Sequence, residues 1–291
     1  MEYGLVKRSR AAETSLDLKM TIPVFYTVNG TPYLRSPGVS LIAKPQFLSS
    51  GLFDFTNSFP DILDFHNYQF DSRLPPAEDL CKFAGQLCYM SLGPKRTTNE
   101  NASKYFNHIK ESGHGSVLEH ANFSFLFYGV SRSLTHELVR HRAGFAFSQV
   151  SQRYVSGKTL RFVERPEYQD DEVMHDAFED RIDDVARAYN IVAEALLMRQ
   201  PQDGISKTDL RKKVNQCARS ILPNETEAPI VVTANVRAWR HFLEARGNSG
   251  AEVEIRLLAL KVLEVLKEHA PILFSDYEVT NGAISSNYRK V

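Results

Sequence analysis

The chain has 291 residues, and its 35 lysines and arginines are balanced by 35 aspartates and glutamates. This length can bury a sizeable core, and a formal net charge of zero gives no support for a general attraction to nucleic acid or to an anionic membrane. The sequence has no apolar run long enough to span a membrane and no signal-peptide core at its start, so we expect a cytoplasmic protein.

The N-terminal part predicts a hairpin, one strand and an irregular stretch. Residues 1–37 are expected to form an extension in which Val24–Leu34 alternates around Asn29-Gly30, a strong hairpin signal. Val39–Ala43 predicts the first core strand. Residues 49–76 are rich in Phe, Asp, Asn, Ser and Pro and predict an irregular connection.

The middle of the chain contains the clearest strand, Ala121–Val130. Phe123, Phe125 and Phe127 share one of its faces, because successive side chains on a strand point to opposite sides. Further elements expected in this part are helices at 77–90, 99–111 and 131–142 and a strand at Leu160–Val163.

The C-terminal half predicts long helices around one more strand. Asp170–Arg199 carries an apolar stripe at spacings of four and three, which is far more often core or subunit contact than a ligand site. The other expected elements are a helix at 207–220, a strand at Ile230–Ala234 and helices at Val236–Arg246 and Glu252–Ala270. With no repeat and no obvious linker, the pattern indicates one mixed α+β domain with an appended N-terminus.

The segment Arg140–Tyr154 is the densest set of anion-binding groups in the chain, and it reads Arg-His-Arg-Ala-Gly-Phe-Ala-Phe-Ser-Gln-Val-Ser-Gln-Arg-Tyr. Arginine is a planar, permanently charged fork for phosphate and carboxylate oxygens, and serine hydroxyls with loop amides complete such cradles. The segment therefore predicts a local site for a small phosphorylated ligand.

The residues beside this triplet support either a pocket wall or a solvated basic face. Arg132, His136 and Arg140 share one helical face by their spacing of four. Ala143–Phe147 predicts an apolar loop, and basic residues beside such a loop are typical of a ligand pocket. From the residues alone, ligand binding and a structural network are equally well supported.

Two further blocks also concentrate polar residues: Gly113–His120 and Arg219–Arg246, which includes Asn235–His241. The histidines and glutamate of the first do not have the spacing of a His-Glu-x-x-His zinc helix, so capping and local hydrogen bonds are the more usual role. No metal is expected.

No motif in the sequence names a reaction. Cys81, Cys88 and Cys217 lie in no nucleophile motif, and an odd number of cysteines suits a reduced compartment, where each is expected to pack as a small apolar group. The sequence also lacks a Gly-x-Ser-x-Gly elbow, a Walker loop and a Gly-x-Gly-x-x-Gly turn. The residues alone therefore indicate a phosphate-ligand pocket without a named chemistry.

Taken together, these blocks resemble the flavin-dependent thymidylate synthases. That family's signature is Arg-His-Arg, seven or eight residues and then Ser, and here Arg140-His141-Arg142 is followed by eight residues and Ser151. Other motifs agree in order: Gly113-His114 with Ser116, Glu119-His120, Gln152-Arg153-Tyr154, Ala218-Arg219 before Leu222-Pro223, and Asn235-x-Arg237 with Arg246. The similarity runs from about residue 38 onward and marks 38–291 as the catalytic domain.

The resemblance implies an α+β fold with a twisted central sheet flanked by long helices, and a homotetramer whose active sites are shared between subunits. It implies reductive methylation of C5 of dUMP to dTMP. Methylenetetrahydrofolate would give the carbon, and NADPH would reduce FAD, which delivers hydride. No nucleic-acid or membrane partner is expected.

The resemblance also assigns roles to matched positions. Arg246 would lie at the uracil and favour loss of its N3 proton, because a fixed cation stabilises the developing anion that makes C5 nucleophilic. His114 would lie near the folate, and Ser151 would bind rather than attack, since no adjacent base is evident. The nucleotide would be held by Glu137, Arg140, Gln149, Ser151, Gln152, Arg153, Arg219 and Arg246. FAD would be held by Ser116, Arg140, His141, Arg142, Gln149, Asn235, Arg237 and His241.

Two departures from the family pattern bear on the substrate. The eight-residue spacing puts an extra residue among Ala143–Ala146, and Gly250 stands where many relatives carry histidine. A roomier pocket could admit a 2′-hydroxyl, so the alternative is a specialised methylase acting on UMP, or on both UMP and dUMP, in modified-nucleoside synthesis. A non-catalytic nucleotide-binding regulator and an NADPH-consuming oxidase are the other hypotheses, and the match at both Arg140 and Arg246 argues against the regulator.

Overall fold

A computed structural model describes residues 22–68, 73–92, 102–156, 160–199, 204, 206–288 and 291. Its strands are β1 (Phe25–Tyr26), β2 (Pro32–Leu34), β3 (Gly38–Ala43), β4 (Asn122–Tyr128), β5 (Phe145–Gln149), β6 (Phe162–Val163), β7 (Ile230–Asn235), β8 (Tyr277–Thr280) and β9 (Ala283–Ser286). Its α-helices are α1 (Ser50–Asn57), α2 (Pro76–Leu87), α4 (Ala102–Glu111), α5 (Arg132–Leu138), α6 (Glu172–Arg199), α7 (Lys207–Ala218), α8 (Val236–Arg246) and α9 (Val253–His269). The fold is mixed α+β, as the sequence predicted.

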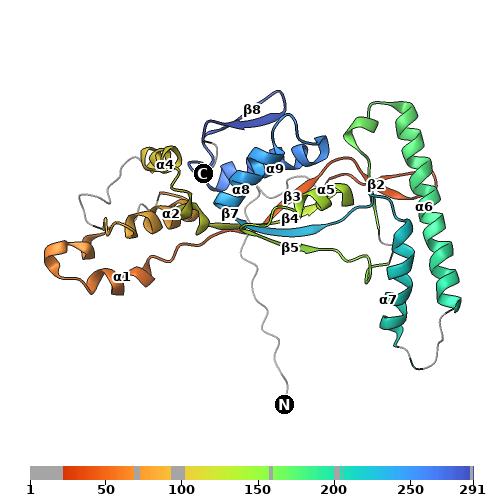
Figure 1. Ribbon diagram of the computed structural model, residues 1–291, viewed down its shortest axis with the longest axis horizontal. Coiled ribbons are helices and arrows are strands. Elements are labelled where there is room, and N and C mark those ends of the chain that lie inside the picture. The colour runs from red at the N-terminus through yellow and green to blue at the C-terminus, as the bar shows by residue number, and fades with distance from the viewer. Residues whose placement is uncertain are drawn as a thin grey trace, which may run out of the picture.

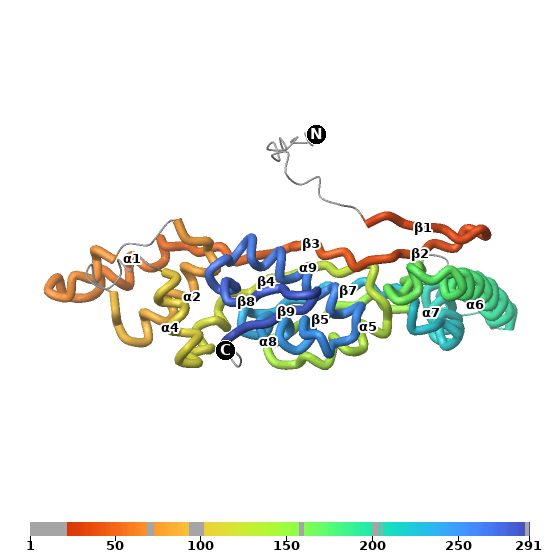
Figure 2. The backbone as a smooth tube through the Cα atoms, turned by 90° about the horizontal axis from the view of Figure 1, so that it is seen from above, coloured from red at the N-terminus to blue at the C-terminus, as the bar shows by residue number. Residues whose placement is uncertain are grey.

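A four-stranded antiparallel sheet in the order β3-β4-β7-β5 forms the centre of an elongated molecule. Helices α1, α2 and α4 lie at one end of this sheet and α6 and α7 at the other, as Figures 1 and 2 show. Strand β7 pairs with β4 on one side, where Asn235 lies opposite Asn122, and with β5 on the other, where Ala234 lies opposite Phe145. The start of β5 therefore lies beside the end of β7, where α8 begins.

The two faces of the sheet differ in burial, as the alternation in β4 predicted. Phe123, Phe125 and Phe127 are buried, and Nε1 of Trp239 in α8 donates a hydrogen bond to the Phe123 carbonyl. Leu126, on the opposite face, is half-buried. Helix α8, which carries several of the candidate site residues, is thus fixed to the phenylalanine face of the sheet.

The predicted N-terminal hairpin is confirmed, and it packs on the long helix α6. Strands β1 and β2 pair antiparallel, and β2 continues parallel to β6. Asp183 of α6 accepts hydrogen bonds from Thr27 Oγ1 and Asn29 Nδ2 at 2.7 Å each, and a further one from Thr31 Oγ1. The hairpin is therefore anchored at its turn by one carboxylate, while the first 21 residues of the predicted extension lie outside the described part of the chain.

The helix predicted at 131–142 is shorter than expected. Helix α5 ends at Leu138, and the amides of Arg140 and His141 bond to the carbonyls three residues earlier, at 3.2 and 3.1 Å. This tightening closes the last turn, and Gly144, with a φ of +76°, then turns the chain into β5. The angle of about 200° expected between Arg140 and Arg142 on a continuous helix therefore does not apply.

Two other expectations about secondary structure were wrong, and one element was missed. The apolar loop Ala143–Phe147 is mostly strand β5, whose Phe145 and Phe147 rings stack with centroids 5.6 Å apart. The irregular stretch 49–76 contains helix α1. The hairpin β8–β9 was missed, although Asn281-Gly282, both with positive φ, repeats the signal at Asn29-Gly30.

The stripe on α6 serves partly as core. Phe178, Ile182 and Tyr189 of the stripe are buried, and its other members, Val185, Val192 and Leu196, are half-buried. Ile191 and Met198, which lie outside the stripe on the same helix, are 61% and 83% exposed. Cys81 is buried as expected, but Cys88 and Cys217 are exposed, so two of the three cysteines do not pack as core groups. In the part of the chain described, no helix is both long enough and apolar enough to cross a membrane.

Candidate functional site

Arg246, at the end of α8, is held by two side chains from the α5 region. Its Nη1 lies 2.7 Å from Oε2 of Glu137, and its Nε donates a hydrogen bond to Nε2 of His141 over 3.0 Å. Glu137 belongs to α5 and His141 to the turn after it. Because α5 already ends at Leu138, both groups reach the guanidinium. The arrangement fixes a half-buried cation in one orientation.

His141 is buried and neutral. Its burial, the charge of Arg246 and the nearby His241 lower the pKa of His141 from 6.5 to about 4. Its ring packs against Phe145 and Phe242, with centroids 5.7 and 5.6 Å away. At neutral pH the imidazole therefore accepts a hydrogen bond from Arg246 and carries no charge that would repel it.

A pocket of about 380 Å³ opens beside this cluster. It is lined by Arg140, His141, Arg142, Ala143, Phe145, His241, Ala245 and Arg246. Arg140 is exposed and bonds back to His136, with its Nε 3.3 Å from the His136 carbonyl. The Arg-His-Arg triplet thus divides its roles: His141 points into the core, while Arg140 and Arg142 are exposed on the pocket wall.

A second pocket, of about 420 Å³, lies at the N-terminal end of α8. Oδ1 of Asn235 caps the helix by accepting a hydrogen bond from the Ala238 amide at 2.8 Å. Nη1 of Arg237 lies 2.6 Å from Oε1 of Glu119, and His241 lines this pocket as well as the first. The positive end of a helix, an arginine and an amide here suit an anionic ligand.

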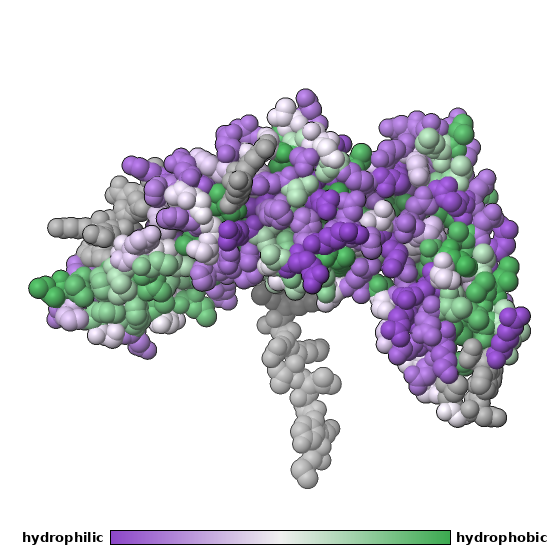
Figure 3. Space-filling model, in the orientation of Figure 1, coloured by the Kyte–Doolittle hydropathy of each residue, from purple (hydrophilic) through white to green (hydrophobic). Residues whose placement is uncertain are grey.

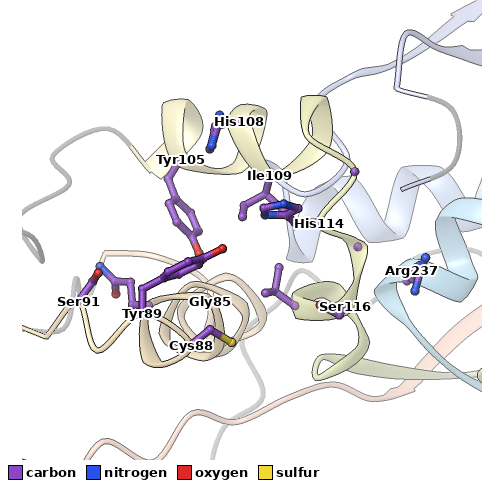
Figure 4. A pocket seen from close by; sticks show the side chains of 14 residues that line it. Gly85, Cys88, Tyr89, Ser91, Tyr105, His108, Ile109, His114, Ser116 and Arg237 are labelled. Carbon is purple, nitrogen blue, oxygen red and sulfur yellow. The ribbon is translucent and has the colours of Figure 1, made fainter.

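The largest of the three pockets described here, of about 740 Å³, lies between α2, α4 and the short 3₁₀ helix η3 (Gly115–Glu119). Figure 4 shows His114 near its centre, Tyr105 extending into it from α4 and Arg237 at its edge. Ser116 lines it too, and Arg237 belongs to this pocket and to the second. The predicted flavin and folate residues therefore border adjoining cavities.

Two glycines mark close approaches within this region. A Cβ on Gly144 would lie 2.9 Å from both Ala238 Cβ and Asn235 Nδ2, and a Cβ on Gly115 would lie 2.8 Å from Arg237 Nε. At Gly144 the turn before β5 therefore packs directly on the start of α8. At Gly115 the neighbour is a flexible side chain, which brings Arg237 close to helix η3 without fixing the two elements.

The remaining predicted nucleotide residues lie at the other end of β5. Gln149 ends that strand, Ser151, Gln152 and Arg153 follow it, and Arg219 begins a short 3₁₀ helix after α7. Gln152 is buried, and within the described residues its Nε2 has no hydrogen-bond partner. At about 3.3 Å per residue, β5 alone separates the two ends by about 13 Å. Within one chain, the predicted site therefore has two separate halves. The Arg246 half contains Glu137, His141 and Arg246, and the Ser151 half contains Ser151–Arg153 and Arg219.

Several residues that line these pockets were not proposed as site residues, among them Tyr105, Glu244 and Val291. Glu119, which pairs with Arg237, belongs to a motif that the sequence did single out, whereas nothing in the sequence distinguishes Val291. Gly250 is exposed in the turn between α8 and α9 and lines none of the three pockets described above. Within the described residues, no cluster of three or more His, Cys, Asp or Glu is arranged to hold a metal.

Comparisons with known proteins agree with the motifs. The family model of the thymidylate synthase complementing protein matches residues 71–272. The flavin-dependent thymidylate synthase of Mycobacterium tuberculosis is 42% identical over 251 residues, which cover 84% of this chain and 91% of the relative. That of Mycolicibacterium gilvum is 46% identical over 243 residues (83% and 90%), and that of Corynebacterium diphtheriae 42% over 217 residues (74% and 84%). The chain belongs to the flavin-dependent thymidylate synthase family.

Proposed function

We propose that this chain is an enzyme that methylates C5 of dUMP to give dTMP in the cytoplasm, with methylenetetrahydrofolate as carbon donor, NADPH as reductant and FAD as bound cofactor. Family membership supports the reaction class. The observation that carries the proposal is Arg246, a cation held by Glu137 and His141 on the wall of a pocket. A parallel assay of dUMP and UMP with the folate and NADPH tests it.

The residues at the start of α8 fit a flavin dinucleotide. Its pyrophosphate is an anion, and Asn235, Arg237 and the α8 N-terminus provide neutral and cationic donors around the second pocket. The close approach at Gly144 brings the backbone of the β5 turn to the same place. We therefore assign Ser116, Arg142, His141, Asn235, Arg237 and His241 to the flavin. When bound, the flavin supplies hydride that originates from NADPH.

Arg246 provides the chemistry expected at the uracil. A guanidinium beside N3 and its neighbouring carbonyl stabilises negative charge on the ring, and charge shared into the ring raises the nucleophilicity of C5. His141 holds the guanidinium without competing for the substrate's charge, because the imidazole is neutral. Glu137 is expected to exchange part of its contact with Arg246 for the nucleotide, since the sequence assigned it to that ligand.

The separation along β5 supports a site shared between copies in a homotetramer. Arg246 and the Ser151–Arg153 segment belong to the two ends of that strand, so a second copy would bring its Ser151 and Arg219 to the Arg246 of the first. Exposed apolar side chains offer surface for such contacts: Figure 3 shows them gathered over α1, and Phe53 and Ile62 in that region are 51% and 91% exposed.

UMP is the second candidate substrate, and the turn before β5 is the observation that favours it. The extra residue is absorbed at Ala143-Gly144, because β5 pairs with β7 without any register shift from Phe145 to Gln149. This turn lines the pockets next to His141 and Asn235. Gly250, the other departure, is exposed and away from them, so the turn is the stronger basis for an altered substrate.

A further inference from the structure

The last turn of α8, which ends at Arg246, is closed by the side chain of Asn248. Nδ2 of Asn248 donates hydrogen bonds to the carbonyls of Glu244 at 3.0 Å and of Ala245 at 2.9 Å. These carbonyls have no backbone donor within the helix, because the residues four positions later lie beyond its end. One side chain therefore satisfies two carbonyls of the turn that carries Arg246.

Both peptide groups that flank Arg246 are hydrogen-bonded. The peptide before it is bonded through the Ala245 carbonyl, and the peptide after it through the Gly247 amide, which donates to the Leu243 carbonyl at 2.8 Å. The backbone of Arg246 is thus held on both sides, while its guanidinium is held by the other residues of the Arg246 half. The side-chain contacts depend on this backbone, because they start from the position of its Cα.

The turn after α8 determines which way the Asn248 amide faces. Its Oδ1 accepts a hydrogen bond from the Gly250 amide at 2.9 Å, and the Ala251 amide donates to the Asn248 carbonyl at 3.1 Å. A rotated side-chain amide would place its oxygen against two carbonyls and its nitrogen against an N–H group, so one orientation satisfies all three bonds. A Cβ on Gly250 would lie only 3.3 Å from Oδ1, so a larger residue there would press on this amide.

Strand β9 holds the next carbonyl at the end of α8. The Ile284 amide donates a hydrogen bond to the Gly247 carbonyl at 2.7 Å, and a Cβ on Gly247 would lie 2.7 Å from Ile284 Cβ. The hairpin is itself fixed to α8, because Asp276 accepts hydrogen bonds from Nη1 and Nη2 of the buried Arg240 at 2.8 and 2.7 Å. Figures 1 and 2 show the hairpin beside α8 and α9. The last turn of α8 is therefore closed by one side chain and one strand.

We propose that Asn248 is a positioning residue for Arg246: its side-chain amide closes the last turn of α8 and so keeps the guanidinium where Glu137 and His141 hold it. Asn248 lines none of the three pockets described above and acts on Arg246 through the backbone. The inference rests on the proposed function, because that function places Arg246 at the uracil. Misplacing a catalytic group by about 1 Å can cost about 10²-fold in rate, so the cap affects the methylation step.

The test uses two variants of the full-length holoenzyme. Asn248→Asp keeps the size of the side chain and an acceptor for the Gly250 amide but has no donor for the two carbonyls, and Asn248→Ala removes the amide without adding a charge. Both should lower kcat about tenfold and change the KM for dUMP by less than about twofold, because an interaction used in the transition state is weakened. FAD content should stay normal. Asn190→Asp is the matched control, because Asn190 is exposed on α6.

Two further measurements separate positioning from a general structural role. In an Arg246→Ala background, Asn248→Ala should not lower the single-turnover rate any further, because the cap acts through the guanidinium. Hydrogen exchange followed by mass spectrometry should be faster in the peptide that covers the end of α8 and unchanged in the peptide that covers α7.

A normal kcat in both Asn248 variants, or unchanged exchange at the end of α8, would overturn the inference. Losses that add to that of Arg246→Ala, or a parallel loss of FAD content, would show a general structural role and would also overturn it. Should Asn248→Asp not fold, the alanine variant decides alone. Wild-type protein that forms no dTMP would refute the proposed function instead, and hydrogen exchange would still decide whether Asn248 holds the turn that carries Arg246.

Discussion

Nε of Arg246 donates a hydrogen bond to Nε2 of His141 over 3.0 Å, although the two residues lie 105 positions apart. A protonated imidazole has no lone pair to accept this bond, so His141 must be neutral for the contact to exist. The low pKa of His141 and the orientation of Arg246 therefore depend on each other. Of the Arg-His-Arg triplet that first indicated anion binding, the histidine therefore serves to hold Arg246 in place.

Replacing Arg246 tests its assigned role at the uracil. Arg246→Ala should lower dTMP formation by about 10²–10³-fold, the usual cost of losing one group that stabilises developing charge. FAD content should stay near normal, because the residues assigned to the flavin pyrophosphate lie at the other end of α8. Arg246→Lys should rescue little, since an ammonium cannot bond to Glu137 and His141 in the same plane.

The control for this variant is Arg187→Ala, because Arg187 is 68% exposed on α6. Single-turnover rates and FAD absorbance measure the two effects separately. Turnover by Arg246→Ala close to that of the control would remove Arg246 from the mechanism.

The titration of His141 should make stability depend on pH. The unfolded chain takes up this proton near pH 6.5 and the folded chain only near pH 4, because burial and Arg246 lower the folded pKa. Acid therefore favours unfolding: the free energy of unfolding should rise by about 3 kcal/mol between pH 4 and 6.5 and gain nothing more from this group at higher pH.

His141→Gln, which keeps an acceptor for Arg246 but does not titrate, should lose this part of the pH dependence. Urea unfolding at pH 4.5 and 7, at fixed protein concentration, gives the comparison. If the free energy of unfolding changed equally between pH 4.5 and 7 in both proteins, a group other than His141 would take up the proton.

Gly144 should be needed for the flavin pocket. Gly144→Ala combines a φ of +76° with a methyl group 2.9 Å from Ala238 Cβ and Asn235 Nδ2, so the start of α8 must move. We expect a loss of about 1–3 kcal/mol in stability and a weaker retention of FAD during gel filtration. Gly282→Ala has a similar positive φ of 70° but open space around it, and so measures the backbone strain alone. Equal behaviour of the two variants would show that the contact at Gly144 is unimportant.

Subunit mixing tests whether sites are shared. Arg219→Ala and Arg246→Ala chains should each be inactive, because each removes one of the two separated halves. Refolded together in equal amounts, they should regain roughly a quarter of wild-type activity if each site takes one half from each of two copies. A mixture as inactive as its components would mean that both halves come from one chain.

The sequence predicted those parts of the fold that depend on local periodicity. Alternation in β4 gave the buried phenylalanine face, and the spacing in α8 gave its bounds, because burial on one side imposes these periods. The end of α5 at Leu138 and the strand β5 were not predicted, since both depend on pairing with β7, which is 89 positions later at Phe145↔Ala234. Pairing partners distant in sequence leave no local pattern.

The candidate site, like the fold, could be predicted from the sequence only in part. Resemblance of the motifs identified Glu137, His141 and Arg246, which the structure brings together, but not that His141 supports Arg246. The distance of Ser151 and Arg219 from that cluster could not be read from spacing either, because β5 extends the segment that the sequence presented as a compact loop. Val291 carried no signal, since an apolar residue after a hairpin is ordinary.

The most direct test of the account is a product assay with purified protein, methylenetetrahydrofolate and NADPH, run in parallel on dUMP and UMP. We expect the purified protein to carry FAD and to convert dUMP to dTMP in step with folate consumption, with Arg246→Ala inactive in the same assay. A protein that oxidises NADPH yet forms no methylated nucleotide from either substrate, or that holds no flavin, would contradict it. Methylation of UMP alone would keep the chemistry and replace the substrate.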